Sequence, residues 1–311
     1  MSQKQILIHI GYHKTGSTFL QDLVFSSEEY GFSSPWDVKE YFENIISVNP
    51  FAYRSSQTRS FFIAKIESAW TRSLVPVLSC EALSGDPWKR GCNSGFNNKL
   101  AADRLAEAFP EGRILIVIRA QASMIFSLYR HSIRSFWSMS IEDYLEQSGG
   151  DKGLHYFDPL FRLEYLEYNW LIEYYQKLFG QENVLVLPYE GLKLRNSDFL
   201  EKLENFTNTH LPRSLNQTTV NQGYSGLSVA LKRWTNKLSP TCAQPNETRY
   251  QKFNNSVFYQ INKITPKWIG EIFDRRLRNS IESQIKGRYK ESNRITAQLT
   301  GLDLQAYGYE I

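Results

Sequence analysis

The segment Ile6-Leu-Ile-His-Ile10 runs directly into Gly11-Tyr-His-Lys-Thr-Gly-Ser-Thr18, and this junction decides the fold. An apolar run of this length predicts a short buried strand, and the residues after Gly16 have the periodicity of a helix. A strand that ends in a glycine-containing turn and leads into a helix directs backbone N–H groups and the positive end of the helix dipole toward one place. The sequence therefore predicts an anion-binding loop between Gly11 and Thr18.

The loop has the glycine spacing of a Walker A motif, because four residues separate Gly11 from Gly16. The lysine that follows the second glycine in that motif is absent, and Ser17 stands in its place. The lysine lies inside the loop instead, as Lys14. This displacement argues against an ordinary ATPase, but it still provides a positive charge beside a bound anion.

The stretch from Tyr12 to Phe19 resembles the 5′-phosphosulfate-binding loop of sulfotransferases that use 3′-phosphoadenosine 5′-phosphosulfate (PAPS) as donor. The family pattern is roughly Tyr-Pro-Lys-Ser/Thr-Gly-Ser/Thr-Thr, and only His13 in place of proline departs from it. The resemblance implies that Lys14 contacts the bridging oxygen between phosphate and sulfate. It also implies that the next four residues bind the 5′-phosphate through N–H and hydroxyl groups: Thr15, Gly16, Ser17 and Thr18.

A second candidate anion site follows the strand predicted at Ile114–Ile118. Arg119 ends that strand, and Ser127 lies on the helix expected after it. This segment resembles the one in sulfotransferases where an arginine and a serine at the same spacing bind the 3′-phosphate of PAPS. A guanidinium fork matches a phosphate dianion, and a hydroxyl completes its coordination. The alternative for Arg119 alone is a surface ion pair.

A third segment, Tyr189-Glu-Gly-Leu-Lys193, resembles the family's Tyr-Glu-Asp-Leu/Met-Lys sequence after a sheet strand. The resemblance implies that Tyr189 contacts the adenine of the donor. Phe19 lies where some members carry an adenine-stacking tryptophan. The alternative for both aromatic residues is an ordinary place in the core.

Transfer of a sulfuryl group to a hydroxyl needs a base that takes the hydroxyl proton. Glu81 is the first candidate, because it follows the strand predicted at Val75–Ser79 and open α/β sheets bind ligands at the carboxyl ends of strands. The sequence Ser-Cys-Glu that ends at Glu81 also resembles the Ser-x-Glu of bacterial members. His13 is the second candidate and His131 the third. Alternatively, Glu81 pairs with a basic side chain and orders the following loop.

Four apolar runs of strand length alternate with segments of helical periodicity. The runs are Ile6–Ile10, Val75–Ser79, Ile114–Ile118 and Val184–Leu187. They predict an α/β fold with a central parallel sheet flanked by helices, P-loop-like as in sulfotransferases, and a largely helical C-terminal part. One long helix is expected from Phe161 to Phe179, before Gly180. No composition shift divides the chain, so residues 1–311 are expected to form a single sulfotransferase domain.

Composition restricts the class of protein. The excess of 36 Lys and Arg over 32 Asp and Glu is too small to indicate a nucleic-acid-binding protein. No apolar stretch is long enough for a signal peptide or a membrane span, so a cytoplasmic protein is expected. Cys80, Cys92 and Cys242 lack metal-ligand spacing, which indicates free thiols and no metal site.

Together these motifs predict a sulfotransferase that moves SO₃ from PAPS, its co-substrate, to an acceptor hydroxyl without a metal. The aromatic content of 14% suits a carbohydrate or other small-molecule acceptor. The acceptor site is expected to be lined by residues 30–60, the Trp88–Phe96 loop and the Ser135–Tyr156 segment. One alternative is a nucleotide or small-molecule kinase with a degenerate P-loop. Another is a non-catalytic protein that binds PAPS or a nucleotide. The sequence leaves the oligomeric state open.

Overall fold

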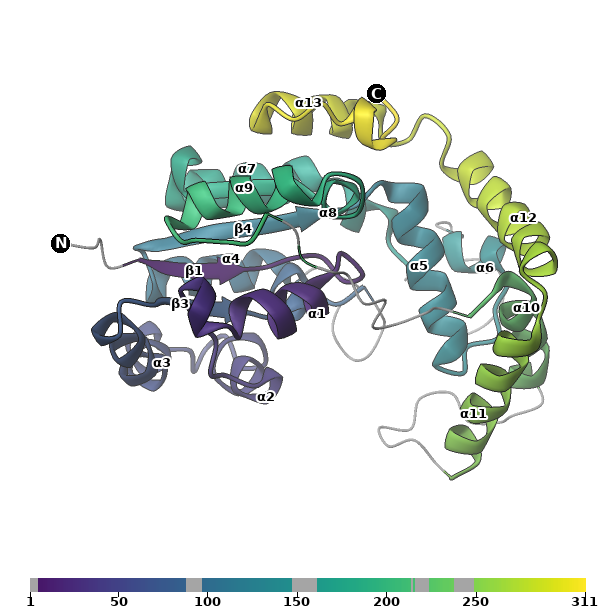
Figure 1. Cartoon of the computed structure of the whole chain (residues 1–311), viewed down its shortest axis with the longest axis horizontal. Coiled ribbons are helices and arrows are strands. Elements are labelled where there is room, and N and C mark those ends of the chain that lie inside the picture. Colours follow the sequence, from purple (N-terminus) through teal and green to yellow (C-terminus); the bar gives the residue numbers. More distant parts are fainter. Residues whose placement is uncertain (1–4, 88–96, 147–160, 214, 216–223, 238–248) are drawn as a thin grey trace.

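Five parallel strands form the central sheet of the computed structural model, in the order β2-β3-β1-β4-β5 (Figure 1). They are β1 (Ile6–His9), β2 (Phe32–Ser33), β3 (Val75–Ser79), β4 (Gly112–Ile118) and β5 (Val184–Pro188). The structure describes residues 5–87, 97–146, 161–213, 215, 224–237 and 249–311, the last range without side chains at 249–253. The predicted parallel α/β sheet is confirmed, and β2 is an edge strand that the sequence did not indicate.

The strands read as continuous apolar runs because helices cover both faces of the sheet. In β4, Ile114 and Ile116 belong to one buried cluster, whereas Leu115 and Val117 belong to the other. The first face lies under α3 (Ser55–Thr71), α4 (Asn98–Ala108) and α7 (Tyr168–Phe179). The second face lies under α1 (Ser17–Phe19), its π-helical continuation η1 (Leu20–Phe25), α8 (Tyr189–Leu194) and α9 (Asn196–Thr207).

A set of helices extends beyond the sheet, at the end of the molecule away from the N-terminus (Figure 1). It comprises α5 (Gln121–Arg134), α6 (Ile141–Leu145), α10 (Gly226–Lys237), α11 (Arg249–Ile264) and α12 (Lys267–Ile285). α10 and α12 pack so closely that a Cβ on Gly226 would lie 2.5 Å from the backbone nitrogen of Asp274. α13 (Lys290–Thr300) then returns to pack on α7. The predicted helical C-terminal part is confirmed.

Short helical segments complete the described chain. They are η2 (Glu28–Tyr30), α2 (Val38–Tyr41), η3 (Phe42–Ile46), η4 (Glu81–Ser84), η5 (Leu163–Leu166), η6 (Gln181–Asn183) and η7 (Gln305–Tyr307). None of the helices in the described ranges combines the length and the apolarity that crossing a bilayer requires.

The single helix expected over Phe161–Phe179 is wrong, because Glu167 separates η5 from α7. The break brings Tyr165 and Tyr168 onto the ring of Tyr12, with ring centroids 5.1 and 4.8 Å away. Edge-to-face contacts of this kind stabilise an aromatic cluster. This cluster lies directly under the loop after β1, and its packing overrides the helical periodicity of the segment.

Candidate functional site

The predicted site residues lie at one edge of the sheet, each just after a different strand. Lys14 follows β1, Glu81 follows β3, Arg119 follows β4 and Tyr189 follows β5. Because all strands are parallel, these four positions share the carboxyl edge. The chain also reverses its direction of strand addition at β1, with β3 on one side and β4 on the other. Open α/β sheets bind ligands where the strand order reverses in this way.

The loop between β1 and α1 contains two residues in the left-handed backbone region. Gly16 has a φ of 84° and Lys14 has a φ of 66°. Glycine adopts this conformation freely, whereas a lysine there costs about 1–3 kcal/mol, and such strain concentrates at functional sites. The start of the loop is held by Tyr12, whose N–H donates to the Val117 carbonyl of β4 at 3.2 Å.

The hydroxyl groups of this loop have different partners. Thr15 Oγ1 donates to the Tyr12 carbonyl at 2.5 Å, so this hydroxyl closes the turn and the donor that Thr15 has left for an anion is its N–H. Ser17 Oγ is buried and has no hydrogen-bond partner among the described residues. Thr18 is exposed in the first turn of α1. A buried hydroxyl without a partner costs about 1–3 kcal/mol, so Ser17 is the loop residue that a bound phosphate would satisfy.

Arg119 connects the loop to the end of β4. Its Nη1 donates to the carbonyl of Lys14 at 2.8 Å, and its Nε donates to Ser123 Oγ at 3.0 Å. Ser127 lies one turn further along α5 and is half-buried. The structure thus brings together the two anion-binding motifs predicted from separate parts of the sequence, and it adds Ser123, which motif spacing did not indicate.

The ring of Tyr189 packs against both motifs. Its Cε2 is 3.0 Å from the place of a Cβ on Gly16, so this position tolerates only glycine without displacement. The Arg119 guanidinium and the Lys193 ammonium each lie 4.8 Å from the Tyr189 ring centroid. Cation–π contacts hold the ring in place. Contact of Tyr189 with adenine stays a prediction.

Two arginines that sequence analysis missed extend the positive charge along α5. The guanidinium carbons of Arg130 and Arg278 lie 4.9 and 3.9 Å from the ring centroid of Phe126. Arg130 belongs to no motif predicted from the sequence. Arg278 lies on α12, far along the chain from Arg130, so only the fold brings the two arginines together. A helical spacing of three residues between Ser127 and Arg130 was the one available signal.

The charges of these arginines act on one another. Burial is the main cause that lowers the pKa of Arg119 and of Arg130, and the Arg278 charge lowers both further. Asp274 opposes this effect at Arg130. Arg130 Nε is also buried without a hydrogen-bond partner in the described part of the chain. The cluster therefore has an excess of positive charge that a dianion would neutralise.

The part of the loop near Glu81 has charges of both signs around it. Burial lowers the pKa of Lys14, the Glu81 carboxylate raises it, and Arg134 and Arg119 lower it. Glu81 and Arg134 are therefore both within electrostatic reach of the Lys14 ammonium. Glu81 is half-buried at the first position of η4.

His13 connects the loop to the segment after Glu81. Burial of the His13 imidazole and the charge of Lys14 lower the pKa of His13 to about 3. A hydrogen bond with the Gly85 backbone opposes this shift. Tyr165 OH donates to the same Gly85 carbonyl at 3.1 Å. At neutral pH His13 is uncharged and a weak base. His131, the third candidate, is half-buried on α5.

No protein-family model matches the chain, and no curated protein sequence matches it. Several solved structures of sulfotransferases resemble its fold. A sulfotransferase from Alicyclobacillus acidocaldarius is 17% identical, with a TM-score of 0.47 over 74% of this chain and 90% of that one. The sulfotransferase domain of the Synechococcus PCC 7002 olefin synthase is 10% identical, with a TM-score of 0.43 over 82% of this chain and 94% of that one. Mouse sulfotransferase SULT7A1, complexed with PAP, is 12% identical, with a TM-score of 0.34 over 95% of this chain and 89% of that one.

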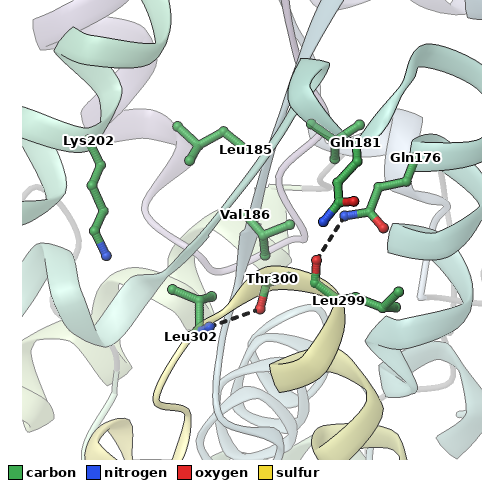
Figure 2. A pocket seen from close by; sticks show the side chains of 9 residues that line it. Gln176, Gln181, Leu185, Val186, Lys202, Leu299, Thr300 and Leu302 are labelled. Carbon is green, nitrogen blue, oxygen red and sulfur yellow. Dashed lines mark hydrogen bonds between the residues drawn. The ribbon is translucent and has the colours of Figure 1, made fainter.

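A cavity of about 220 Å³ lies elsewhere, beside the first half of β5 (Figure 2). Its lining includes Val184 and Val186 of β5, with Lys202 of α9 on one side. Gln176 Nε2 donates to the Leu299 carbonyl at 3.1 Å across its other side. Since Tyr189 follows the opposite end of β5, this cavity is separate from the loop after β1.

Several predicted features lie outside the described residues. These are the whole Trp88–Phe96 loop, the part of the Ser135–Tyr156 segment after Glu146, and two cysteines, Cys92 and Cys242. Cys80 is buried and has a free thiol. Within the described ranges, no group of three or more His, Cys, Asp or Glu side chains is arranged to hold a metal ion.

Proposed function

We propose that this protein is a PAPS-dependent sulfotransferase. The hydrogen bond from Arg119 Nη1 to the Lys14 carbonyl carries the proposal, because it joins the 5′ and 3′ anion sites into one unit. PAPS is anionic at both the 5′ and the 3′ position of its ribose, so it needs two linked cationic sites. The buried Ser17 hydroxyl supplies an unsatisfied donor in the loop, and Arg130 Nε supplies one on α5.

In the proposed reaction the acceptor oxygen attacks sulfur in line with the bond to the 5′-phosphate. As the new O–S bond forms, the old S–O bond breaks and its electrons remain on the phosphate of adenosine 3′,5′-bisphosphate. Lys14 and the loop N–H groups stabilise that developing charge. Glu81 takes the proton of the acceptor hydroxyl. Burial lowers the pKa of His13 to about 3, so its imidazole loses the advantage in basicity that a histidine normally has over a carboxylate.

The acceptor is proposed to carry its hydroxyl on a carbohydrate or another small molecule. Support comes from the aromatic content of the chain, 14%. Ring-bearing acceptors bind in sites of this composition.

The first test is donor binding. Adenosine 3′,5′-bisphosphate should raise the free energy of unfolding by about 2.7 kcal/mol at about 100 times its Kd, and ATP with Mg²⁺ should do so much less. Thermal unfolding with each ligand measures the difference. Equal or stronger stabilisation by ATP with Mg²⁺ would favour a kinase. Strong stabilisation by the bisphosphate without turnover of any acceptor would favour a non-catalytic binding protein.

The second test concerns the arginine cluster. Replacing Arg278 with glutamine should weaken binding of adenosine 3′,5′-bisphosphate by about 1.5–3 kcal/mol, since a charge-assisted hydrogen bond is lost. Binding of adenosine 5′-phosphosulfate, which lacks the 3′-phosphate, should change little. Isothermal titration with both ligands measures this selectivity.

Arg276→Gln on another face of the same helix is the matched control and should bind both ligands normally. A comparable loss for both ligands in Arg278→Gln would contradict a 3′-phosphate role. Arg119 is a poorer test residue, because Arg119→Ala also removes the bond to the Lys14 carbonyl.

A further inference from the structure

The helices that extend beyond the sheet have a charge unlike that of the rest of the chain. Residues 224–288 contain 12 Lys and Arg but only 4 Asp and Glu, a net charge of +8. The whole chain has a net charge of +4, so the remainder is negative. A basic segment on an otherwise acidic protein indicates an anionic partner for that segment.

The same segment exposes large apolar side chains at the junction of α11 and α12. Ile264 is 78% exposed, Trp268 is 64% exposed, and Ile272 is also exposed. Because Trp268 and Ile272 are four residues apart on α12, they lie on one side of this helix. Exposed apolar residues gathered in this way mark an interaction site.

Basic side chains flank these apolar residues. We call the arm face the set of exposed residues Lys263, Ile264, Lys267, Trp268, Ile272 and Arg275. No ion pair of the described residues involves the three bases. One acid, Glu271, is exposed between them. The arm face therefore keeps a net positive charge around an apolar centre.

The opposite side of α12 is already occupied. Gly270 of α12 approaches Ser225 so closely that a Cβ there would lie 3.0 Å from the serine Cβ. Ile281 and Ile285 are buried in the core. α12 thus packs with one side on α10 and α5, which leaves Trp268, Ile272 and Arg275 on the side of α12 that faces away from these helices.

We propose that the arm face docks the protein on the surface of an anionic lipid bilayer. Trp268, Ile264 and Ile272 would enter the interfacial region, where tryptophan is favoured. Lys263, Lys267 and Arg275 would lie among the lipid phosphates, each adding attraction to an anionic surface. The proposal is independent of the sulfotransferase activity, because none of these residues contacts the anion-binding loop.

Two other occupants fit the arm face less well. A second copy of the chain that pairs arm face to arm face would bring like charges together, which opposes association. A soluble polyanion would pair with the bases but would leave three large apolar side chains in water. A bilayer with anionic headgroups satisfies both the charge and the apolar surface.

Sedimentation with vesicles tests the proposal. The full chain should sediment with vesicles of phosphatidylcholine mixed with phosphatidylglycerol, and far less with vesicles of phosphatidylcholine alone. Lys263→Gln with Lys267→Gln should weaken this binding about 30-fold, from about one kcal/mol for each charge. Ile264→Ser with Trp268→Ser should weaken it about tenfold or more. Added salt should weaken binding of the wild type.

A matched control exists on α7, where Trp170 is 54% exposed and Lys177 is also exposed. Trp170→Ser with Lys177→Gln should leave vesicle binding unchanged. All variants should keep the wild-type melting temperature, since the substituted side chains are at the surface.

Three results would overturn the proposal. One is wild-type binding that is absent, or equal on vesicles with and without phosphatidylglycerol. Another is an equal loss in the α7 control. The third is the absence of vesicle binding together with another interaction that depends on the arm face. That interaction would be a dimer in analytical ultracentrifugation or retention on dextran sulfate.

Discussion

Lys14→Ala should lower kcat by about 10²–10³-fold, the effect of losing one donor to a developing oxyanion. Binding of adenosine 3′,5′-bisphosphate should fall much less, because the ammonium contact strengthens as the charge on the leaving phosphate forms. Single-turnover rates with PAPS and one identified acceptor, compared with titrations of the bisphosphate, separate the two effects.

The structure makes this substitution a clean test. Arg119 holds Lys14 through its backbone carbonyl, which alanine retains. Alanine also meets the same left-handed backbone, at a φ of 66°, so the strain of the loop is nearly unchanged. Lys14→Gly is the control for strain, and it should lose as much kcat as alanine. Equal losses in kcat and in bisphosphate affinity would instead indicate that Lys14 only shapes the donor site.

The sheet and the loop could be predicted from the sequence because their signals are local. β1, β3, β4 and β5 are short apolar runs, and Gly16 marks the turn into α1. Tyr189 and Arg119 were predicted because each directly follows a strand and lies in a segment that resembles a sulfotransferase motif. Parallel strands bring all such positions to one edge, so a one-dimensional pattern was enough to predict their proximity.

The remaining features depend on contacts between distant segments. β2 has only two residues, Phe32–Ser33, and exists through pairing with β3. The break at Glu167 results from packing of tyrosines under the loop. Arg278 reaches Phe126 only because α12 packs on α5. No periodicity or motif in the local sequence carries information of this kind.

α5 contacts both the region around Arg119 and the helices that extend beyond the sheet. Its first turn places Ser123 beside Arg119, and its later turns present Arg130 and Arg134. α12 covers this helix from the outside and contributes Arg278 to the same cluster. A change in the packing of α12 should therefore affect the proposed 3′-phosphate site more than the loop after β1.

Glu81→Gln should lower kcat by about 10²–10⁴-fold if Glu81 is the base, while binding of adenosine 3′,5′-bisphosphate is retained. A base must be deprotonated, so the wild-type rate should fall at low pH, and this acid limb should disappear in the variant. The His13→Ala and His131→Ala variants, assayed with the same acceptor, should keep the acid limb. A Glu81→Gln variant with near-normal kcat and an intact acid limb would pass the role to a histidine.

The alkaline limb of the same profile gives a second and independent signature. Lys14 must stay protonated to stabilise the leaving phosphate, so the rate should fall as pH rises through its pKa, which burial places below the usual lysine value. The Glu81 carboxylate raises the pKa of Lys14, whereas Arg134 lowers it. Glu81→Gln should therefore move the alkaline limb to lower pH, and Arg134→Gln should move it to higher pH. Shifts of the same sign in both variants would show that the alkaline limb belongs to a group other than Lys14.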